Sequence, residues 1–308
     1  MKTAPITFGH LAASVIAVPP LAQTPDLGLA RAPNVALIDH LQAAGVRSLM
    51  YGGNANFYNI PVSAYAKTLE FLAENTAEEC WVIPAVGPDF GRMVDQAPIV
   101  RDLKFPMAMA LPAAKGSYTE AGMATALRRL SDSTGAPILM YAKHDGCLDP
   151  ALIGKLVDDG VVAFIKYAVV RDDPKVDNFL RALTAAVDPR RIISGIGERP
   201  VVDHFTTFGL TSFTSGAISI APRLSMAILH ALQAGGLTRA AELRDQFIAI
   251  EDCRDTFGPA RVLHDAVTLA GVADMGPLSP LQSNLVGKER DRTAAAAREL
   301  LSLERAAA

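Results

Sequence analysis

The sequence contains few cysteines, and they are far apart. Its 308 residues include three cysteines, Cys80, Cys147 and Cys253, with no CxxC spacing among them. We therefore expect neither a disulfide framework nor a zinc-cysteine cluster, and a reducing compartment such as the cytoplasm fits best. The six histidines form no HxH or HExxH pattern. The sequence accordingly predicts no metal site.

Long apolar runs and an excess of one charge are also missing. No segment reaches the ~18 uninterrupted apolar residues that a membrane-spanning helix needs. The N-terminal stretch carries a single lysine before its apolar part and is interrupted by His10. We therefore interpret it as part of the fold rather than as a secretory signal. A net charge of −3 and a pI near 6.1 give no reason to expect nucleic acid or a membrane as partner.

Nucleotide-binding and serine-hydrolase motifs are absent as well. The stretch GIGERP (195–200) contains GxG, but it lacks a third glycine and follows the seventh strand-like run. A dinucleotide fingerprint is therefore not expected. No GxSxG motif and no P-loop occurs. We expect no cofactor, and a small molecule as the partner.

The chain does contain a regular alternation of apolar runs and amphipathic, helix-like segments. The strand-like runs are SVIAVP (14–19), SLMYG (48–52), CWVIPAV (80–86), FPMAMAL (105–111), PILMY (137–141), VVAFIK (161–166), RIISG (191–195) and LTSFTS (210–215). Eight strand-helix units predict an α/β fold, a (β/α)8 TIM barrel. An open, doubly wound sheet of six or seven of these strands remains the alternative.

Beyond Pro222 the pattern predicts helices only. Their expected positions are 224–236, 238–258, 259–271 and about 290–304. The first would close the barrel, and the others would form appended C-terminal helices. We therefore divide the chain into a barrel domain, residues 1–234, and a helical extension, residues 235–308.

Lys166 is the one amine in the apolar stretch VVAFIKYAVV (161–170). In barrels of this kind the reactive groups lie at the C-terminal ends of the strands, and Lys166 ends the sixth run. In an apolar pocket a lysine loses hydration of its charged form, so its pKa falls and it becomes a nucleophile able to form a Schiff base with a ketone. A lysine that snorkels to solvent or pairs with a buried carboxylate is the alternative.

Two further strand ends carry candidate groups. Tyr141 ends the neighbouring fifth run and is placed to move protons, unless it is simply a core tyrosine. The stretch YGGNAN follows the second run and contains Gly52, Gly53 and Asn54. Consecutive backbone N–H groups in such a turn can bind a carboxylate, although a plain strand-to-helix turn would have the same sequence.

The order of these motifs resembles that of the dihydrodipicolinate synthase and N-acetylneuraminate lyase family of class I aldolase-type enzymes, over roughly residues 10 to 290. The resemblance implies that Lys166, in FIKYA, is the Schiff-base lysine and that Tyr141, in PILMY, is the catalytic tyrosine. It also places GGNAN (52–56) on the turn that binds the keto-acid carboxylate. SGIGE (194–198) and TSGAISIAP (214–222) match the segments after the seventh and eighth strands, which implies substrate-binding roles for Gly195, Ser215, Gly216 and Ile218.

The sequence departs from the family pattern at three places. Gly53 and Asn54 stand where the family has two threonines, and LPAAKG (111–116) stands where it has a pair of tyrosines. Lys143 and His144 occur where it has an arginine that binds a second carboxylate. Within the same superfamily, GGNANFYNI (52–60) and HDGC (144–147) are similar to segments of 5-dehydro-4-deoxyglucarate dehydratases.

The resemblance thus implies a Schiff-base-forming lyase that acts on a 2-keto acid or a 2-keto-3-deoxy sugar acid, either as a dehydratase or as an aldolase. Two alternatives stay open. One is a catalytically weakened member that binds a keto or sugar acid without turnover, and the other is a dihydrodipicolinate synthase proper. Members of the family are commonly tetramers of paired dimers, so we expect a homo-oligomer, a dimer or a tetramer.

Overall fold

Each of the eight apolar runs contains a β-strand. The structure is a computed structural model that describes residues 1–114, 116–278 and 280–307. Its strands are β1 (Ile16–Ala17), β2 (Ser48–Tyr51), β3 (Trp81–Val86), β4 (Met109–Ala110), β5 (Ile138–Ala142), β6 (Val162–Tyr167), β7 (Ile192–Ser194) and β8 (Thr214–Ser215). Their β-branched and aromatic residues pack well on a pleated, buried surface, which explains why these runs become strands.

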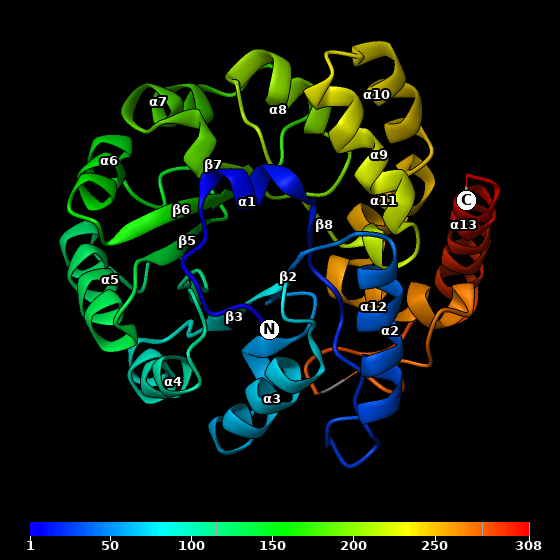
Figure 1. The fold of residues 1–308 in the computed structure, drawn as a ribbon, viewed down its shortest axis with the longest axis horizontal. Coiled ribbons are helices and arrows are strands. Elements are labelled where there is room, and N and C mark those ends of the chain that lie inside the picture. The colour runs from blue at the N-terminus through cyan, green and yellow to red at the C-terminus, as the bar shows by residue number, and fades with distance from the viewer. Residues whose placement is uncertain (115, 279, 308) are drawn as a thin grey trace.

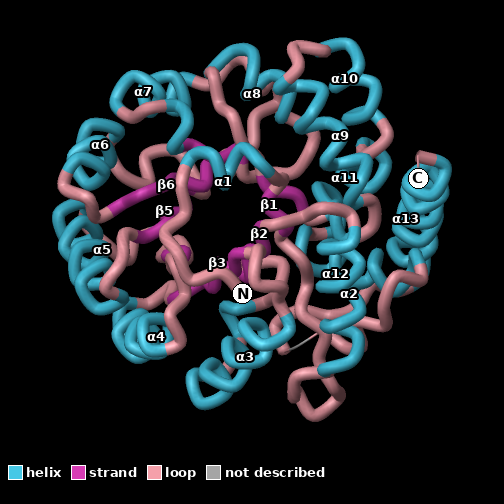
Figure 2. The backbone as a smooth tube through the Cα atoms, viewed as in Figure 1, coloured by secondary structure: helices cyan, strands magenta, loops and turns pink. Residues whose placement is uncertain are grey.

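The strands are parallel and form a closed barrel. Their order is β7-β6-β5-β4-β3-β2-β1-β8, so β1 pairs with β2 on one side and with β8 on the other. A parallel bridge between Ser194 and Phe213, with the N–H of Ser194 donating to the carbonyl oxygen of Ser212 over 3.0 Å, joins β7 to the segment before β8. The predicted (β/α)8 barrel is confirmed, and the open sheet is wrong. Figure 2 shows the strands enclosed by a ring of helices.

Helices follow the strands around the outside and continue past the barrel. They are α1 (Phe8–Ala13), α2 (Arg31–Ala43), α3 (Val62–Asn75), α4 (Phe90–Asp102), α5 (Glu120–Thr134), α6 (Pro150–Asp158), α7 (Asn178–Ala186), α8 (Val201–Phe208), α9 (Pro222–Gln233), α10 (Leu237–Asp245), α11 (Ile248–Phe257), α12 (Pro259–Ala270) and α13 (Gly287–Ala306). Short 3-10 turns lie at η1 (Phe57–Asn59), η2 (Pro189–Arg191) and η3 (Ala217–Ser219). In Figure 1 the last helices stack on the side of the barrel where α2 and α9 lie.

Helix α1 had no counterpart among the sequence predictions. It crosses the opening of the barrel at the end where the strands begin (Figure 1). Its Phe8 ring lies 6.0 Å from the ring of Phe164, and its His10 ring lies 4.1 Å from that of Trp81. Leu11 is fully buried. Because α1 covers this opening, the opposite opening, where the strands end, is the one left for a site.

The segment 238–258, expected as one helix, is two. Helix α10 ends at Asp245 and α11 begins at Ile248, with a short turn at Gln246 and Phe247 between them. Phe247 is fully buried at this turn. The break therefore buries a phenylalanine and gives α11 a direction of its own, which brings one of its faces to the barrel mouth.

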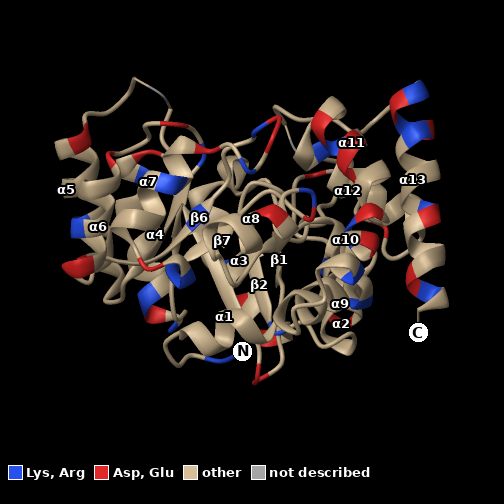
Figure 3. Ribbon diagram, turned by 90° about the horizontal axis from the view of Figure 1, so that it is seen from above, with Lys and Arg blue, Asp and Glu red and all other residues tan. Residues whose placement is uncertain are grey.

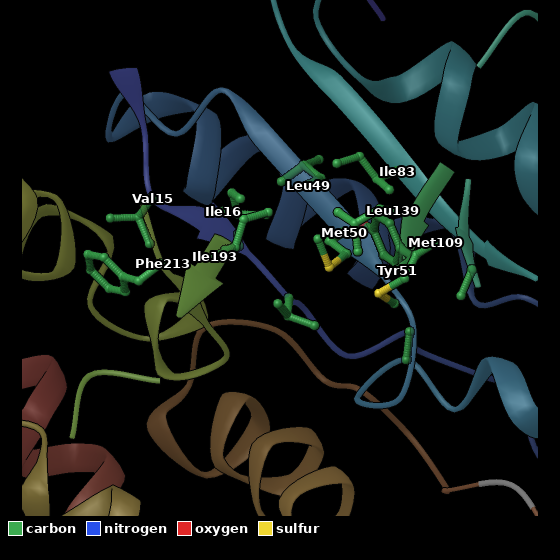
Figure 4. Close-up of a cluster of buried hydrophobic side chains, with 14 of the residues drawn as sticks. Val15, Ile16, Leu49, Met50, Tyr51, Ile83, Met109, Leu139, Ile193 and Phe213 are labelled. Atoms are coloured by element: carbon green, nitrogen blue, oxygen red, sulfur yellow. The ribbon is translucent and has the colours of Figure 1, made fainter. Parts of the chain in front are cut away.

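The core fills the barrel and the layer between the strands and helices. Figure 4 shows part of it, with Leu49, Ile83 and Leu139 among apolar side chains contributed by several strands. These residues are essentially inaccessible to solvent. Lysine, arginine, aspartate and glutamate are interspersed over the outer helices and the loops (Figure 3). The few ionisable groups that are buried therefore stand out.

Candidate active site

Lys166 and Tyr141 lie side by side at the carboxyl ends of β6 and β5. The two strands pair in parallel with Tyr141 opposite Lys166, so both side chains leave the sheet on the same face. The Nζ atom of Lys166 lies 4.6 Å from the centroid of the Tyr141 ring. The structure thus brings together the two residues that the sequence proposed for the chemistry.

The amine of Lys166 is buried, and no carboxylate pairs with it in the part of the chain that the structure describes. The residue is 5% exposed, and among the described residues no carboxylate forms an ion pair with it. Burial lowers the pKa of Lys166 from 10.5 to about 7, and the positive charges of Lys143 and Arg254 add to this effect. Near neutral pH a large share of the amine is therefore unprotonated and able to act as a nucleophile.

Tyr141 keeps its proton under the same conditions. Burial raises the pKa of its hydroxyl to about 12. At neutral pH the Tyr141 hydroxyl is therefore uncharged. It can donate its proton to a nearby group and take a proton back afterwards. Next to a neutral amine it is suited to deliver a proton to an oxygen atom that leaves or gains charge.

Gly195 packs directly against Lys166. Its N–H donates to the carbonyl oxygen of Tyr167 over 2.6 Å. A methyl group at Gly195 would lie 2.5 Å from that oxygen and 2.8 Å from Cγ of Lys166. Only glycine therefore allows the loop after β7 to approach the base of the lysine so closely.

From this close contact we predict that Gly195→Ala lowers the stability of the protein and displaces Lys166. The added methyl has no room, so β6 and β7 must separate, and we expect the free energy of unfolding to fall by about 1–3 kcal/mol. Gly91→Ala is the matched control, because a methyl there would meet no atom within 4 Å and should change stability by about 1 kcal/mol or less. Urea unfolding of both variants measures the difference. Equal stability of the two variants would contradict the close packing at Gly195.

The turn after β2 lies against the segment after β8. The carboxamide of Asn54 donates to the carbonyl oxygen of Val18 over 3.1 Å, and a methyl at Gly216 would lie 2.9 Å from the Asn54 nitrogen. A methyl at Gly52 would lie 2.5 Å from Cε of Met109. Within the described chain, the N–H groups of Gly53 and Asn54 have no backbone acceptor, so they are available to an anion.

Ser215 and Ile218 hold the segment after β8 in shape. The Ser215 hydroxyl oxygen accepts a hydrogen bond from the N–H of Ile218 over 2.9 Å. Both residues are buried, at 1% and 0% exposure. Their contacts shown here are internal, and a direct role toward substrate stays a prediction for both.

The positions that depart from the family pattern have partners of their own. Lys143 lies two residues beyond Tyr141, is exposed, and has its Nζ 5.9 Å from the centroid of the Tyr58 ring. Tyr118 donates its hydroxyl to the carbonyl oxygen of Cys147 over 3.0 Å, and it borders the same small cavity as His144. Lys143 and Tyr58 therefore join the mouth of the barrel, and Tyr58 was not among the predicted site residues.

Sequence reasoning also missed three buried ionisable residues next to the site. Glu198, Glu251 and Arg254 are 0%, 1% and 8% exposed. Glu198 follows β7, whereas the other two come from α11 in the C-terminal extension. The sequence does hold one signal: Glu251 and Arg254 are interleaved with the apolar residues Ile250 and Cys253, which are buried on the same helix.

Within the described part of the chain, the requirements of a metal site, a disulfide and a membrane-spanning helix are not met. No group of three or more histidine, cysteine, aspartate or glutamate residues there is arranged to hold a metal ion. The three cysteines are buried and free. Among the same residues, no helix is both long enough and apolar enough to cross a membrane.

The fold and site define a (β/α)8 barrel with a buried lysine and a tyrosine paired at its mouth. Solved structures with this fold include dihydrodipicolinate synthase from Oceanobacillus iheyensis (18% identity, TM-score 0.83, 97% of this chain and 100% of that one). A dihydrodipicolinic acid synthase family protein from E. coli K12, solved in complex with pyruvate, has a TM-score of 0.82 at 19% identity, covering 93% and 98% of the two chains. Sialic acid aldolase from Ruminococcus gnavus has a TM-score of 0.81 at 15% identity, covering 96% and 98%.

Sequence comparison gives a similar result. A probable 5-dehydro-4-deoxyglucarate dehydratase of Rhizobium meliloti (strain 1021) is 22% identical over 250 residues, which is 78% of this chain and 79% of that protein. No family model matches the chain. The resemblance predicted from the motifs, to the synthase and lyase family and to the glucarate dehydratases, is thereby confirmed as a resemblance in fold and in sequence.

Proposed function

We propose that this chain is a lyase of the Schiff-base type, in which Lys166 forms an imine with a 2-keto acid or a 2-keto-3-deoxy sugar acid. The observation that carries the proposal is the buried amine of Lys166, which has no acidic partner among the described residues and lies beside the Tyr141 ring at the barrel mouth. The similar proteins support the class, since they are named as a synthase, an aldolase and a dehydratase.

Imine formation uses the two side chains in turn. The neutral nitrogen of Lys166 attacks the C2 carbonyl carbon, and the oxygen takes up a proton to give a carbinolamine. That oxygen then leaves as water with a second proton while the C=N bond forms. Burial raises the pKa of the Tyr141 hydroxyl to about 12, so this group is protonated near pH 7. It can supply the proton to the oxygen and recover one from the ammonium formed in the attack.

The imine then withdraws electrons from C3, and two bond cleavages become possible. In dehydration, C3 loses a proton and the C4–O bond breaks, with the hydroxyl leaving as water. In aldol cleavage, the C4 hydroxyl loses its proton and the C3–C4 bond breaks to an aldehyde and an enamine. We favour dehydration, because GGNANFYNI (52–60) and the Rhizobium relative both point to the glucarate dehydratases.

The substrate carboxylate has a proposed place at the turn after β2. The N–H groups of Gly53 and Asn54 lack backbone acceptors among the described residues. Gly216 lies close to Asn54, so it would border the space in which the carboxylate binds. Gly52, Gly195, Ser215 and Ile218 would shape the walls. Residence in the cytoplasm, assembly into dimers or tetramers and the domain boundary at residue 234 remain predictions.

Binding without turnover is the second candidate, because Gly53, Asn54, Ala113 and Ala114 replace hydroxyl-bearing residues of the family. A dihydrodipicolinate synthase proper is less favoured, since Lys143 and His144 replace the arginine for the second carboxylate. Trapped imine together with failure to consume any keto acid would favour the binder. Turnover of a 2-keto-3-deoxy sugar acid would favour the lyase.

The decisive experiment reduces the imine in place. The full chain is incubated with pyruvate and sodium borohydride, and the modified peptide is identified by mass spectrometry. We expect a reduced pyruvyl adduct on Lys166, its loss in Lys166→Met, and its retention in Lys155→Met, where an exposed lysine of α6 is changed. No adduct on Lys166 in the unaltered protein rejects imine chemistry.

A further inference from the structure

A cluster of buried ionisable side chains ties the C-terminal extension to the barrel mouth. Glu251 and Arg254 lie three residues apart on α11 and form an ion pair of 2.8 Å. Arg254 Nη1 also donates to the carbonyl oxygen of Ile196 over 2.6 Å. From the loop after β7, Glu198 accepts a hydrogen bond of 2.7 Å from the hydroxyl of Ser225 in α9.

The segment 195–197 contacts both this cluster and the side chain of Lys166. A methyl at Gly197 would lie 2.5 Å from Arg254 Nη1 and 2.6 Å from Glu251 Oε1, whereas a methyl at Gly195 would lie 2.8 Å from Cγ of Lys166. The segment 195–197 thus meets Lys166 at Gly195 and Arg254 at Gly197. Gly197 has φ +82, which favours glycine, so the sequence at this segment suits both close contacts.

Burial shifts the titration of both carboxyls in the cluster. It raises the pKa of Glu251 to about 8, and the neighbouring Glu198 adds to the rise, whereas the positive charge of Arg254 opposes it. Burial also raises the pKa of Glu198, although the Ser225 hydroxyl donates a hydrogen bond to its carboxyl. Arg254 thus lies against two carboxyls whose burial disfavours their negative charge.

Among the described residues, the other charged groups beside the guanidinium are Asp255, 3.0 Å away on α11, and Arg199, which pairs with Asp252 and Asp255. The amine of Lys166 is influenced by the charge of Lys143 and lies beside the uncharged phenol of Tyr141. Asp255 is 41% exposed at its side chain, so solvent screens its charge more than that of the buried guanidinium. At the amine, the positive charges of Lys143 and Arg254 both lower the pKa of Lys166.

We propose that Arg254 is a positioning residue for the barrel-mouth amine: the C-terminal extension holds its guanidinium against residues 196 and 197, which fixes the loop after β7 against Lys166 and keeps the amine neutral and nucleophilic. The proposal deepens the proposed function and rests on it for the role of the nucleophile. It also makes α11 part of the reactive unit. Removal of the extension would then remove an element of the site itself.

The test measures the amine directly, without a keto acid. Acetic anhydride acylates unprotonated amines, so the pH dependence of labelling at Lys166, read by peptide mass spectrometry, gives the midpoint of its titration. In Arg254→Gln, which keeps a hydrogen-bond donor but removes the charge, we expect the midpoint to move up by about one pH unit and labelling at pH 7 to slow about fivefold. Arg254→Lys should stay near the unaltered protein.

Arg261→Gln is the matched control, because Arg261 also lies in the extension and pairs with Glu289 at 2.9 Å. Where Arg254→Gln fails to fold, the double variant with Glu251→Gln removes the whole buried pair and serves instead. An unchanged midpoint without the guanidinium, or an equal shift in Arg254→Lys, overturns the proposal. Failure of pyruvate trapping would reject the imine but leave this labelling result readable, so the two failures are distinguishable.

Discussion

Replacing Lys166 with methionine is expected to abolish turnover while making the protein more stable. The proposed nucleophile is lost, so we expect the rate with any keto-acid substrate to fall by about four orders of magnitude or more. Methionine fills similar space in this 5% exposed position. It carries no amine, so folding no longer requires the removal of a proton or the burial of a charge. We expect the free energy of unfolding at pH 7 to rise by about 2–5 kcal/mol.

The sign of this effect follows from proton binding. The pKa of Lys166 is lowered from 10.5 to about 7 in the folded protein, so between these values the unfolded chain binds more protons. Stability of the unaltered protein therefore rises with pH across this window. The advantage of Lys166→Met should be largest at pH 7 and below, and it should shrink towards pH 10.5.

Chemical denaturation at several pH values, together with a rate assay, measures both parts. Lys155→Met is the control, because this lysine of α6 is exposed and should affect neither quantity. If Lys166→Met were inactive but less stable than the unaltered protein, the amine would have a stabilising partner that the proposal does not include. Full activity would remove Lys166 from the mechanism.

Replacing Tyr141 with phenylalanine is expected to lower turnover by about two to three orders of magnitude. The ring that packs 4.6 Å from Nζ of Lys166 remains, so the amine keeps its surroundings. Only the hydroxyl is lost, and with it the proposed proton donor for the carbinolamine oxygen. Because this oxygen leaves during imine formation, we expect the initial rate of borohydride trapping with pyruvate to fall together with turnover, measured on the same preparation.

Tyr65→Phe is the matched control for this variant. The Tyr65 hydroxyl donates to the carbonyl oxygen of Ala85 over 2.8 Å and is fully buried, so its removal should cost about 1 kcal/mol of stability and leave turnover intact. Unchanged turnover in Tyr141→Phe would show that the phenol moves no proton in the slow step. Equal loss in both variants would point to a general structural effect.

The two predictions have one physical cause. A lysine that is buried without a carboxylate lowers the stability of the fold, and the same burial gives a nucleophile near neutral pH. A salt bridge to Lys166 would reverse both effects, since it would hold the amine protonated.

Much of the fold could be predicted because its signals are local. Eight apolar runs separated by amphipathic segments encode strands and helices through short-range periodicity, and all eight became strands of one parallel sheet. The break between α10 and α11 was missed, since the turn at Gln246 and Phe247 lacks glycine and proline, and the burial of Phe247 outweighs helix propensity there. Helix α1 was missed because it is only six residues long.

The sequence by itself determined that Lys166 ends a strand next to the one that Tyr141 ends, because strand order in a parallel barrel follows chain order. Only the tertiary structure decided what surrounds the amine. Glu251 and Arg254 lie more than 80 residues farther along the chain, and their approach to residues 195–197 depends on how α11 packs on the barrel. Electrostatic effects depend on distance in space, whereas periodicity is a property of neighbouring residues in the sequence. No local pattern could therefore reveal that the charge of Arg254 lies near Lys166.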